Sequence, residues 1–317
     1  MQSDFAKTYF DSLAALEHSA PRTSLETTLR GYSQYTFNEH SNACSAISMA
    51  MCYAFLVLHE TFITLESDFS AISSIDTSSM RNALLIGNRS WSAILTMDEA
   101  QYTDNKRALH SFLTPHEILV ATAKAGHKTD IIYTEHVTVC GNVNTLRETD
   151  LMSLFEIIKR MSDYATANNE PVAAALVCRG STVAVLFPSH THRKRCVEAP
   201  NWCAMIDSHP LSGTEIRVFK TPDHLTAYFM QNSIGMSAAE IRVEQLFSSK
   251  DGTQREIAAQ KSHADASSTA PTLQSSTESV LASKTFTQQH AIMNSSIVQN
   301  TPSKQVDLLE LRLNKVP

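Results

Sequence analysis

The chain has 317 residues and a formal net charge of −6, and 43% of its residues are hydrophobic. Residues 1–247 carry 19 Lys and Arg against 26 Asp and Glu, so this part of the chain is mildly acidic. An acidic surface argues against nucleic-acid binding, because contacts to phosphates require a basic face, whereas a basic protein partner is compatible with it.

Residues 248–317 have a different composition, rich in Ser, Thr, Gln and Ala and poor in large apolar side chains. Such a segment buries too little apolar surface to offset the entropy lost on ordering. We therefore expect one domain over residues 1–247, large enough for its own core, and a disordered tail over 248–317. A short helix near 305–313 could serve there as a docking element for a virion or host protein, although so short a helix is marginal alone.

Helices dominate the predicted elements in the first part of the domain. Apolar residues at helical spacing predict a helix over residues 4–18, followed by a polar connection from Pro21 to Ser33. A longer apolar helix begins near Ala43, with Ser41 or Asn42 as its N-cap.

Two more helices follow. One begins near Asp76 and is expected to end at Gly87, because glycine is a common helix terminator. The other begins at Thr114-Pro115, an N-cap followed by proline in the first helical position, and is expected to close at Gly126.

Strands dominate from Asp130 onward, where β-branched and aromatic residues are frequent. They are expected over Ile131–Val139, Val172–Cys178, Thr182–Phe187, Trp202–Ser208 and Glu215–Phe219. A turn at 179–181 joins two of them into a hairpin, and helices are expected from Asp150 and from Thr221-Pro222. Helices first and an antiparallel β-region afterwards predict an α+β fold, with a helical N-terminal part on an antiparallel sheet.

The first residue that could carry chemistry is Cys44, at the start of the helix that begins near Ala43. A cysteine in an opening helical turn lies among backbone N–H groups without helical partners, at the positive end of the helix dipole. Both effects stabilise its thiolate, and the same N–H groups can stabilise an oxyanion. The alternative is a small buried cysteine with a structural role.

The second candidate is the pair Asp207 and His209, at the end of the predicted strand that precedes Pro210. Side chains at i and i+2 of a strand lie on the same face, so the carboxylate can orient the imidazole. The alternative is a turn-capping aspartate beside an incidental histidine.

The order of these residues favours a Cys–His–Asp triad, because an early helix-borne Cys and a late strand-borne His form the papain-like arrangement. An amide side chain ahead of Cys44 would complete the oxyanion hole. Gln34 and Asn38 both have the right chemistry, and Gln34 is preferred.

Several segments resemble the deubiquitinases at the start of herpesvirus large tegument proteins. The resemblance covers about residues 30–232, and its motifs are Gly31–Gln34, Asn42–Met49, Leu84–Gly87 followed by Trp91, Ala174–Phe187, Ala204–Pro210 and Ile216–Phe229. Ala43 stands where that family would have a Gln or a similar polar residue.

The resemblance implies a papain-like fold, a triad of Cys44, His209 and Asp207, and Gln34 in the oxyanion hole. It also implies cleavage after the C-terminal glycine of ubiquitin or a ubiquitin-like protein, without a cofactor. A second hypothesis is a catalytically inactive papain-like module that binds ubiquitin or a virion or host protein. A third is a peptidase or acyltransferase that uses the same triad on another substrate.

A zinc site is a weaker alternative, drawn from His190, His192, Cys196, Cys203 and His209. Histidine and cysteine are zinc ligands, but their spacing here matches no zinc pattern, so no metal is expected.

The cysteines show no CxxC pair and no spacing typical of secreted disulfide-rich proteins. The N-terminus has no signal-peptide pattern, and no run approaches the roughly 18 apolar residues that span a bilayer. We expect no membrane association and a reducing location, in the cytoplasm or nucleus of a host cell or in a virion tegument.

Overall fold

A computed structural model describes residues 23–37, 41–101, 113–124, 130–142, 146, 151–248 and 304–314. The helix expected over 4–18, the Asn38 alternative, the caps expected at Asp150 and Gly126, and residues 249–303 of the expected tail lie outside these ranges.

Within the described residues, seven strands form one sheet in which every neighbouring pair is antiparallel. Their order across the sheet is β1 (Ser24–Arg30), β8 (Gly213–Phe219), β7 (Cys203–Asp207), β6 (Ser181–Phe187), β5 (Val172–Cys178), β9 (Gln305–Leu313) and β4 (Ile131–Val139). A separate pair consists of β2 (Ile63–Leu65) and β3 (Ile72–Ile75). The mixture of helices and antiparallel sheet confirms the α+β expectation.

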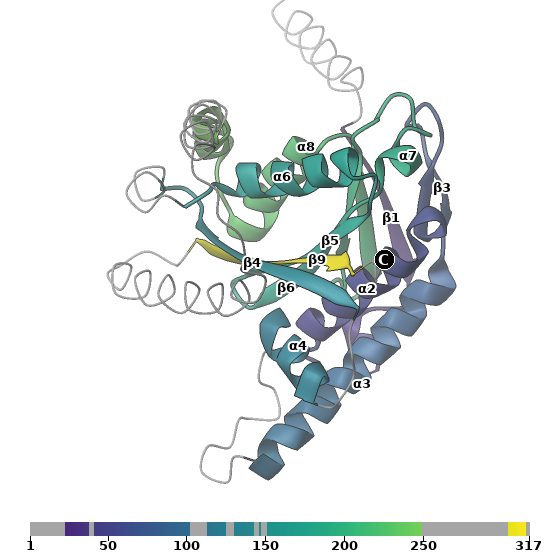
Figure 1. Ribbon diagram of the computed structural model, residues 1–317, viewed down its shortest axis with the longest axis vertical. Coiled ribbons are helices and arrows are strands. Elements are labelled where there is room, and N and C mark those ends of the chain that lie inside the picture. The colour runs from purple at the N-terminus through teal and green to yellow at the C-terminus, as the bar shows by residue number, and fades with distance from the viewer. Residues whose placement is uncertain are drawn as a thin grey trace, which may run out of the picture.

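Helices cover both faces of the large sheet (Figure 1). On one face lie α2 (Cys44–Phe62), α3 (Thr77–Gln101) and α4 (Pro115–Lys124), and on the other lie α6 (Leu154–Ala167) and α8 (Pro222–Phe229). Ala173 and Ala175 of β5 contribute to the core beneath α2, whereas Ala174 and Leu176 contribute to the core beneath α6. Because both faces are covered, β5 and β6 are almost continuously apolar.

The central strands and most helices lie where the sequence predicts them. Arg179 and Gly180 have φ values of 52° and 79° in the turn of the β5–β6 hairpin. Two successive left-handed residues suit the right-handed twist of the flanking strands. Shorter helical segments are η1 (Gln34–Thr36), α7 (His190–Arg193) and η2 (Met230–Ile234).

The expectation of a polar connection from Pro21 to Ser33 is wrong for residues 24–30, which form β1. This is an edge strand whose described partner is β8. Leu25 and Leu29 are buried in the core beneath α2, four positions apart and hence on one face of the strand. With only two large apolar residues among polar ones, the segment has little strand signal until a neighbouring strand supplies its hydrogen bonds.

The expectations of a tail disordered throughout 248–317 and of a helix near 305–313 are both wrong for residues 305–313. This segment is β9, a long strand of the large sheet, paired with β5 on one side and β4 on the other. Val306 and Leu308 are buried beneath α6, while Leu309 and Leu311 are buried beneath α2. The nonamer has an apolar row for each face of a strand, and pairing with two neighbours satisfies its backbone, which an isolated helix of this length could not do as well.

The expectation that Gly87 ends a helix is also wrong, because α3 continues through it to Gln101. A Cβ atom added at Gly87 would lie 2.5 Å from Cα of Ile47. Glycine therefore allows α3 to cross the first turns of α2 at very short range.

We expect Gly87→Ala to destabilise the protein by about 2 kcal/mol, because overpacking against backbone outweighs the better helix propensity of alanine. Urea unfolding would measure the change. Asn82→Ala is a matched control, since Asn82 is exposed on the same helix and should change stability by less than about 0.5 kcal/mol. A Gly87→Ala protein as stable as this control would contradict the expected clash.

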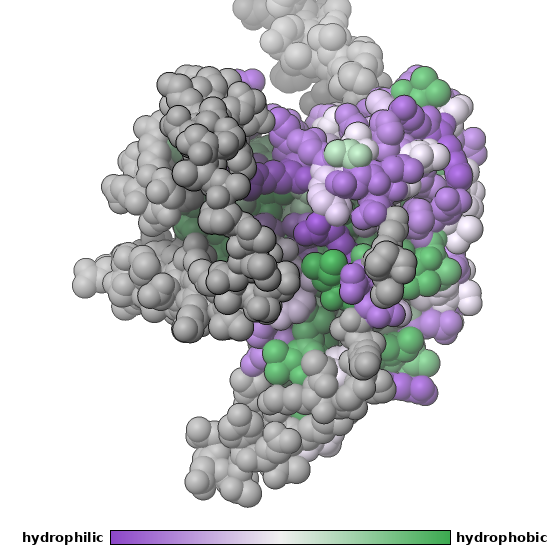
Figure 2. Space-filling view, in the orientation of Figure 1, coloured by the Kyte–Doolittle hydropathy of each residue, from purple (hydrophilic) through white to green (hydrophobic). Residues whose placement is uncertain are grey.

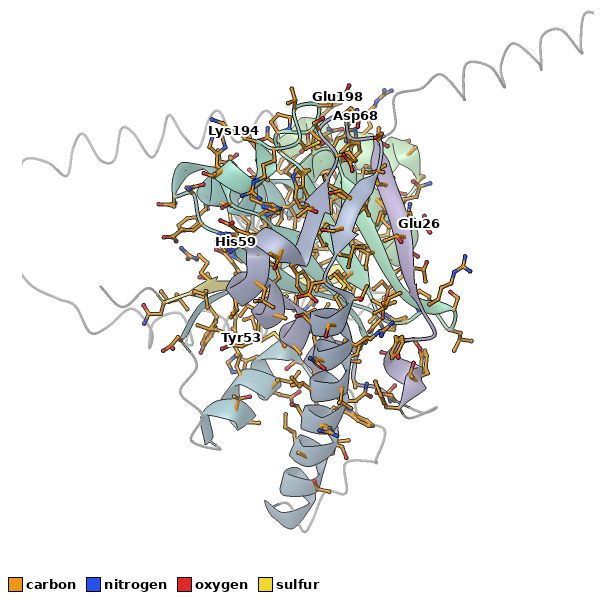
Figure 3. The ribbon with its side chains drawn as sticks, turned by 90° about the vertical axis from the view of Figure 1, so that its right-hand side faces the viewer. Glu26, Tyr53, His59, Asp68, Lys194 and Glu198 are labelled. Atoms are coloured by element: carbon orange, nitrogen blue, oxygen red, sulfur yellow. The ribbon has the colours of Figure 1, made fainter. Side chains whose placement is uncertain are left out.

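Helix α2 is long and apolar enough to cross a membrane by length and composition, whereas the sequence was expected to hold no apolar run of that length. In the structure 56% of that apolar window is buried, and α2 packs against β5, β6 and α3 as a core helix. Tyr53 and Val57 of this helix remain about half exposed (49% and 51%). Figure 3 shows the side of the molecule on which Tyr53 lies. In Figure 2, hydrophobic residues gather around α2 and α4, and the surface over α7 and β3 is largely hydrophilic.

Candidate active site

Cys44 is the first residue of α2 and is almost fully buried. The N-cap position is Ala43, whose side chain makes no capping hydrogen bond, and the expected cap Ser41 instead accepts from the Ala43 N–H at 3.2 Å. The N–H of a first helical residue has no partner inside its own helix. The sulfur and backbone N–H of Cys44 therefore lie at the positive end of the α2 dipole.

The expected contact between Asp207 and His209 is present, but β7 ends at Asp207, so His209 reaches the carboxylate from the residues that follow the strand and not from a shared strand face. Nδ1 of His209 lies 2.5 Å from Oδ1 of Asp207, and the same oxygen accepts from the His209 backbone N–H at 2.9 Å. The side chains of His209 and Asp207 are 23% and 28% exposed, so the pair lies at the surface end of the strand. The carboxylate thus holds the imidazole by Nδ1 and leaves Nε2 available.

The structure brings Cys44 and His209, which lie far apart in the sequence, into hydrogen-bonding contact. Burial raises the pKa of Cys44, but hydrogen bonding to His209, the charge of His209 and hydrogen bonds from Thr182 outweigh burial, so the pKa lies below its ordinary 9.0. Burial lowers the pKa of His209, but hydrogen bonds to Asp207 and Cys44 and their charges raise it to about 10. The lowered pKa of Cys44 and the raised pKa of His209 both favour a thiolate beside an imidazolium over a neutral thiol beside a neutral imidazole.

A direct prediction concerns the pH dependence of Cys44 alkylation by iodoacetamide. The thiolate is the reactive form, so the rate should rise with pH through the pKa of Cys44 and level off above it. Because that pKa is lowered, the inflection should lie below 9.0. Mass spectrometry can follow the reaction at Cys44 separately from the other five cysteines, which are buried free thiols. An inflection at or above 9.0 would contradict the ion pair.

Gln34, the preferred oxyanion residue, lies beside this pair in η1. Its backbone N–H donates to the carbonyl of Ser208, the residue between Asp207 and His209, at 3.0 Å. The residue is 2% exposed, and its side-chain Oε1 has no hydrogen-bond partner among the described residues. A buried amide oxygen without a partner is costly for stability, which fits a side chain retained for a function.

The zinc alternative does not assemble. Nε2 of His192 hydrogen-bonds to the carbonyl of Ile63 at 2.9 Å, while Cys196 and Cys203 belong to cores on opposite faces of the sheet. Across the described ranges, no group of three or more His, Cys, Asp or Glu side chains is placed to hold a metal ion.

The β5–β6 turn also belongs to the site, which the sequence does not predict. The Cys44 sulfur lies 3.8 Å from the carbonyl oxygen of Gly180, and Thr182 is also in contact with the start of α2. The hairpin itself was predicted, but no local signal shows that its turn lies against a helix 136 residues earlier in the chain.

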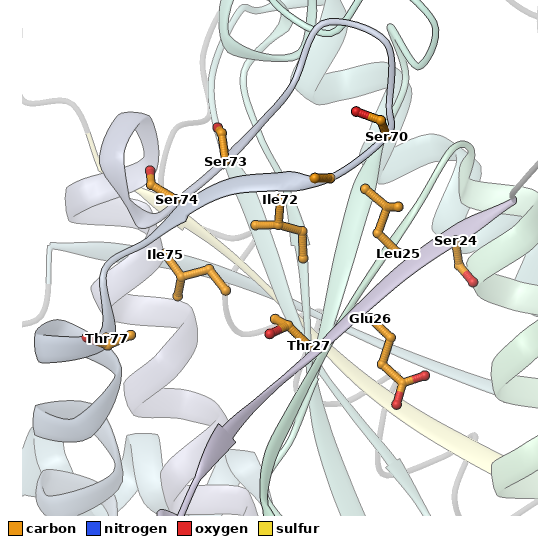
Figure 4. A pocket seen from close by; sticks show the side chains of 11 residues that line it. Ser24, Leu25, Glu26, Thr27, Ser70, Ile72, Ser73, Ser74, Ile75 and Thr77 are labelled. Atoms are coloured by element: carbon orange, nitrogen blue, oxygen red, sulfur yellow. The ribbon is translucent and has the colours of Figure 1, made fainter.

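A hollow that Cys44 does not line lies between β1 and β3 (Figure 4). Its volume is about 620 Å³, and it is lined by Ser24–Thr27, Ser70–Ile75 and Thr77. Side chains of Leu25, Ile72 and Ile75 project into it. None of the triad residues lines it, so it is separate from the site at Cys44.

No protein-family model matches the chain, and no curated protein matches it significantly. The chemistry proposed below therefore rests on the geometry of Cys44, His209, Asp207 and Gln34.

Proposed function

We propose that the protein is a papain-like cysteine peptidase that hydrolyses isopeptide bonds made by ubiquitin or a ubiquitin-like protein. The observation that carries the proposal is the arrangement of three side chains: Cys44 at the start of α2 is hydrogen-bonded to His209, whose Nδ1 lies 2.5 Å from Oδ1 of Asp207. The pKa of Cys44 is lowered and that of His209 is raised to about 10, as this arrangement requires. Shifts of this kind in a Cys–His pair, oriented by a carboxylate, are characteristic of an activated nucleophile.

In the first half of the reaction the Cys44 thiolate attacks the carbonyl carbon of the terminal glycine. The negative charge that develops on the carbonyl oxygen is stabilised by the Cys44 backbone N–H and the Gln34 side-chain amide. Protonated His209 gives its proton to the lysine nitrogen, the C–N bond breaks, and a thioester to Cys44 remains.

In the second half a water molecule attacks the thioester carbonyl while neutral His209 accepts its proton. The C–S bond breaks, the ubiquitin carboxylate leaves, and the thiolate–imidazolium pair is restored. Asp207 keeps Nδ1 of His209 protonated throughout, so that Nε2 performs both transfers.

The choice of ubiquitin as substrate rests on the resemblance of the segments around Gln34, Cys44 and Asp207–Pro210 to the tegument-protein deubiquitinases. The geometry around Cys44 supports acyl transfer in general. The resemblance specifies the acyl group, which is the C-terminal glycine of ubiquitin or a ubiquitin-like protein.

A ubiquitin carrying a C-terminal electrophile tests this function. We expect a covalent adduct with the wild-type chain at Cys44 and none with Cys44→Ala, while Cys203→Ala, which removes a thiol buried in the opposite core, should still react. Absence of an adduct from folded wild-type protein would overturn the proposal. Alkylation by small thiol reagents without a ubiquitin adduct would indicate another acyl substrate.

One observation favours an inactive, ubiquitin-binding module as the second candidate. Cys44 is only 1% exposed, so a substrate carbonyl reaches the sulfur only if neighbouring groups move. Non-covalent binding of unmodified ubiquitin, together with failure of the electrophile to react, would favour this candidate.

A further inference from the structure

Thr182, the second residue of β6, is held by two hydroxyl groups from the start of α2. Oγ of Ser45 lies 2.6 Å from Oγ1 of Thr182, and Oγ of Ser48 donates to the Thr182 carbonyl at 3.1 Å. All three residues are buried, with Thr182 only 1% exposed. Hydrogen bonds in such an environment are strongly directional and costly to lose, so they fix Thr182 relative to α2.

This arrangement lies directly against the nucleophile. Two residues before Thr182, the Gly180 carbonyl lies 3.8 Å from the Cys44 sulfur. After burial and the stronger effects of His209, hydrogen bonds from the N–H and hydroxyl of Thr182 are further causes that lower the pKa of Cys44. If Ser45 donates its proton to Thr182 Oγ1, the proton of the Thr182 hydroxyl remains available for the sulfur.

We propose that Thr182 is a positioning residue for the Cys44 thiolate, donating to the sulfur while Ser45 and Ser48 hold it in place. The inference rests on the proposed function, because it requires Cys44 to act as a thiolate. It adds a second support to the nucleophile, on the side of the β5–β6 turn and independent of His209.

The ionisable group that acts on Cys44 within the described part of the chain is His209, itself paired with Asp207. Both remain when Thr182 is changed, so a substitution there should shift the titration of Cys44 without abolishing its activation.

The test compares Thr182→Val with Thr182→Ser in the pH profile of Cys44 alkylation by iodoacetamide. Valine has nearly the same shape as threonine but no hydroxyl, whereas serine keeps the hydroxyl and loses only a methyl group. We expect the inflection to move up by about one pH unit in Thr182→Val, because a hydrogen bond to a charged group is lost. In Thr182→Ser it should stay within a few tenths of a unit of the wild type.

An unchanged inflection in folded Thr182→Val protein would overturn the inference and leave Thr182 a link between α2 and β6. An equal shift in Thr182→Ser would overturn it too, since packing rather than the hydroxyl would then be responsible. If Thr182→Val does not fold, Ser45→Ala takes its place: an upward shift supports the inference, and no shift overturns it. A wild-type inflection at or above 9.0 would instead be a failure of the proposed function, because the thiolate itself would not be stabilised.

Discussion

Removal of residues 304–317 is expected to unfold the domain, although these residues end a segment whose composition resembles a disordered tail. β9 pairs with β5 and β4, and without it β4 loses the partner with which it is paired in the large sheet. Four apolar side chains of β9, from Val306 to Leu311, are buried in the two cores. At about 1.5–3 kcal/mol each, their loss is comparable to the whole stability of an ordinary domain.

Circular dichroism and thermal unfolding of the truncated chain would test this expectation, with a chain ending at Asn314 as control. The control keeps β9 and its terminal hydrogen bond from the Asn314 N–H to the Asp130 carbonyl. Leu308→Ala and Leu309→Ala, one on each face of the sheet, should each cost about 2–5 kcal/mol. A truncated protein that melts at the same temperature as the control would show that β9 contributes nothing to the fold.

Substitution of His209 by alanine is expected to have the largest effect on activity of any change that leaves the sulfur in place. The variant loses proton transfer to the leaving amine, which contributes about 10²–10⁴-fold to such reactions. It also loses the hydrogen bond and the charge of His209, which are the largest effects that counter the burial of Cys44. The pKa of Cys44 should therefore rise, and the thiolate should become scarce at neutral pH. Both losses reduce the rate of hydrolysis.

Hydrolysis of a ubiquitin C-terminal fluorogenic amide would measure the effect, with His190→Ala as the control for loss of a histidine outside the site. Asp207→Asn should give a smaller decrease, because the imidazole remains but loses the carboxylate that orients it and raises its pKa. If His209→Ala retained activity within about twofold of wild type, His209 would not be the general acid and base.

The sequence by itself determined the elements and site features that depend on local chemistry. The apolar stripe of α2 placed Cys44 at a helix start, and the separation of only two residues placed Asp207 beside His209 at the end of β7. The glycine-containing turn predicted the β5–β6 hairpin. These features arise from hydrogen bonds and side-chain directions within a few residues, so a short stretch of sequence contains the needed information.

Only the tertiary structure decided the remaining features. β1 and β9 become strands because distant neighbours satisfy their backbone hydrogen bonds. Gly87 lies inside α3, where glycine allows Ile47 of α2 to pack directly against it. Thr182 of β6 contacts Cys44 of α2 only because the folded chain brings these two elements together. In each case the stabilising partner lies far away in the chain. The free energy that favours the observed conformation therefore exists only once the chain has folded, and local propensity cannot reveal it.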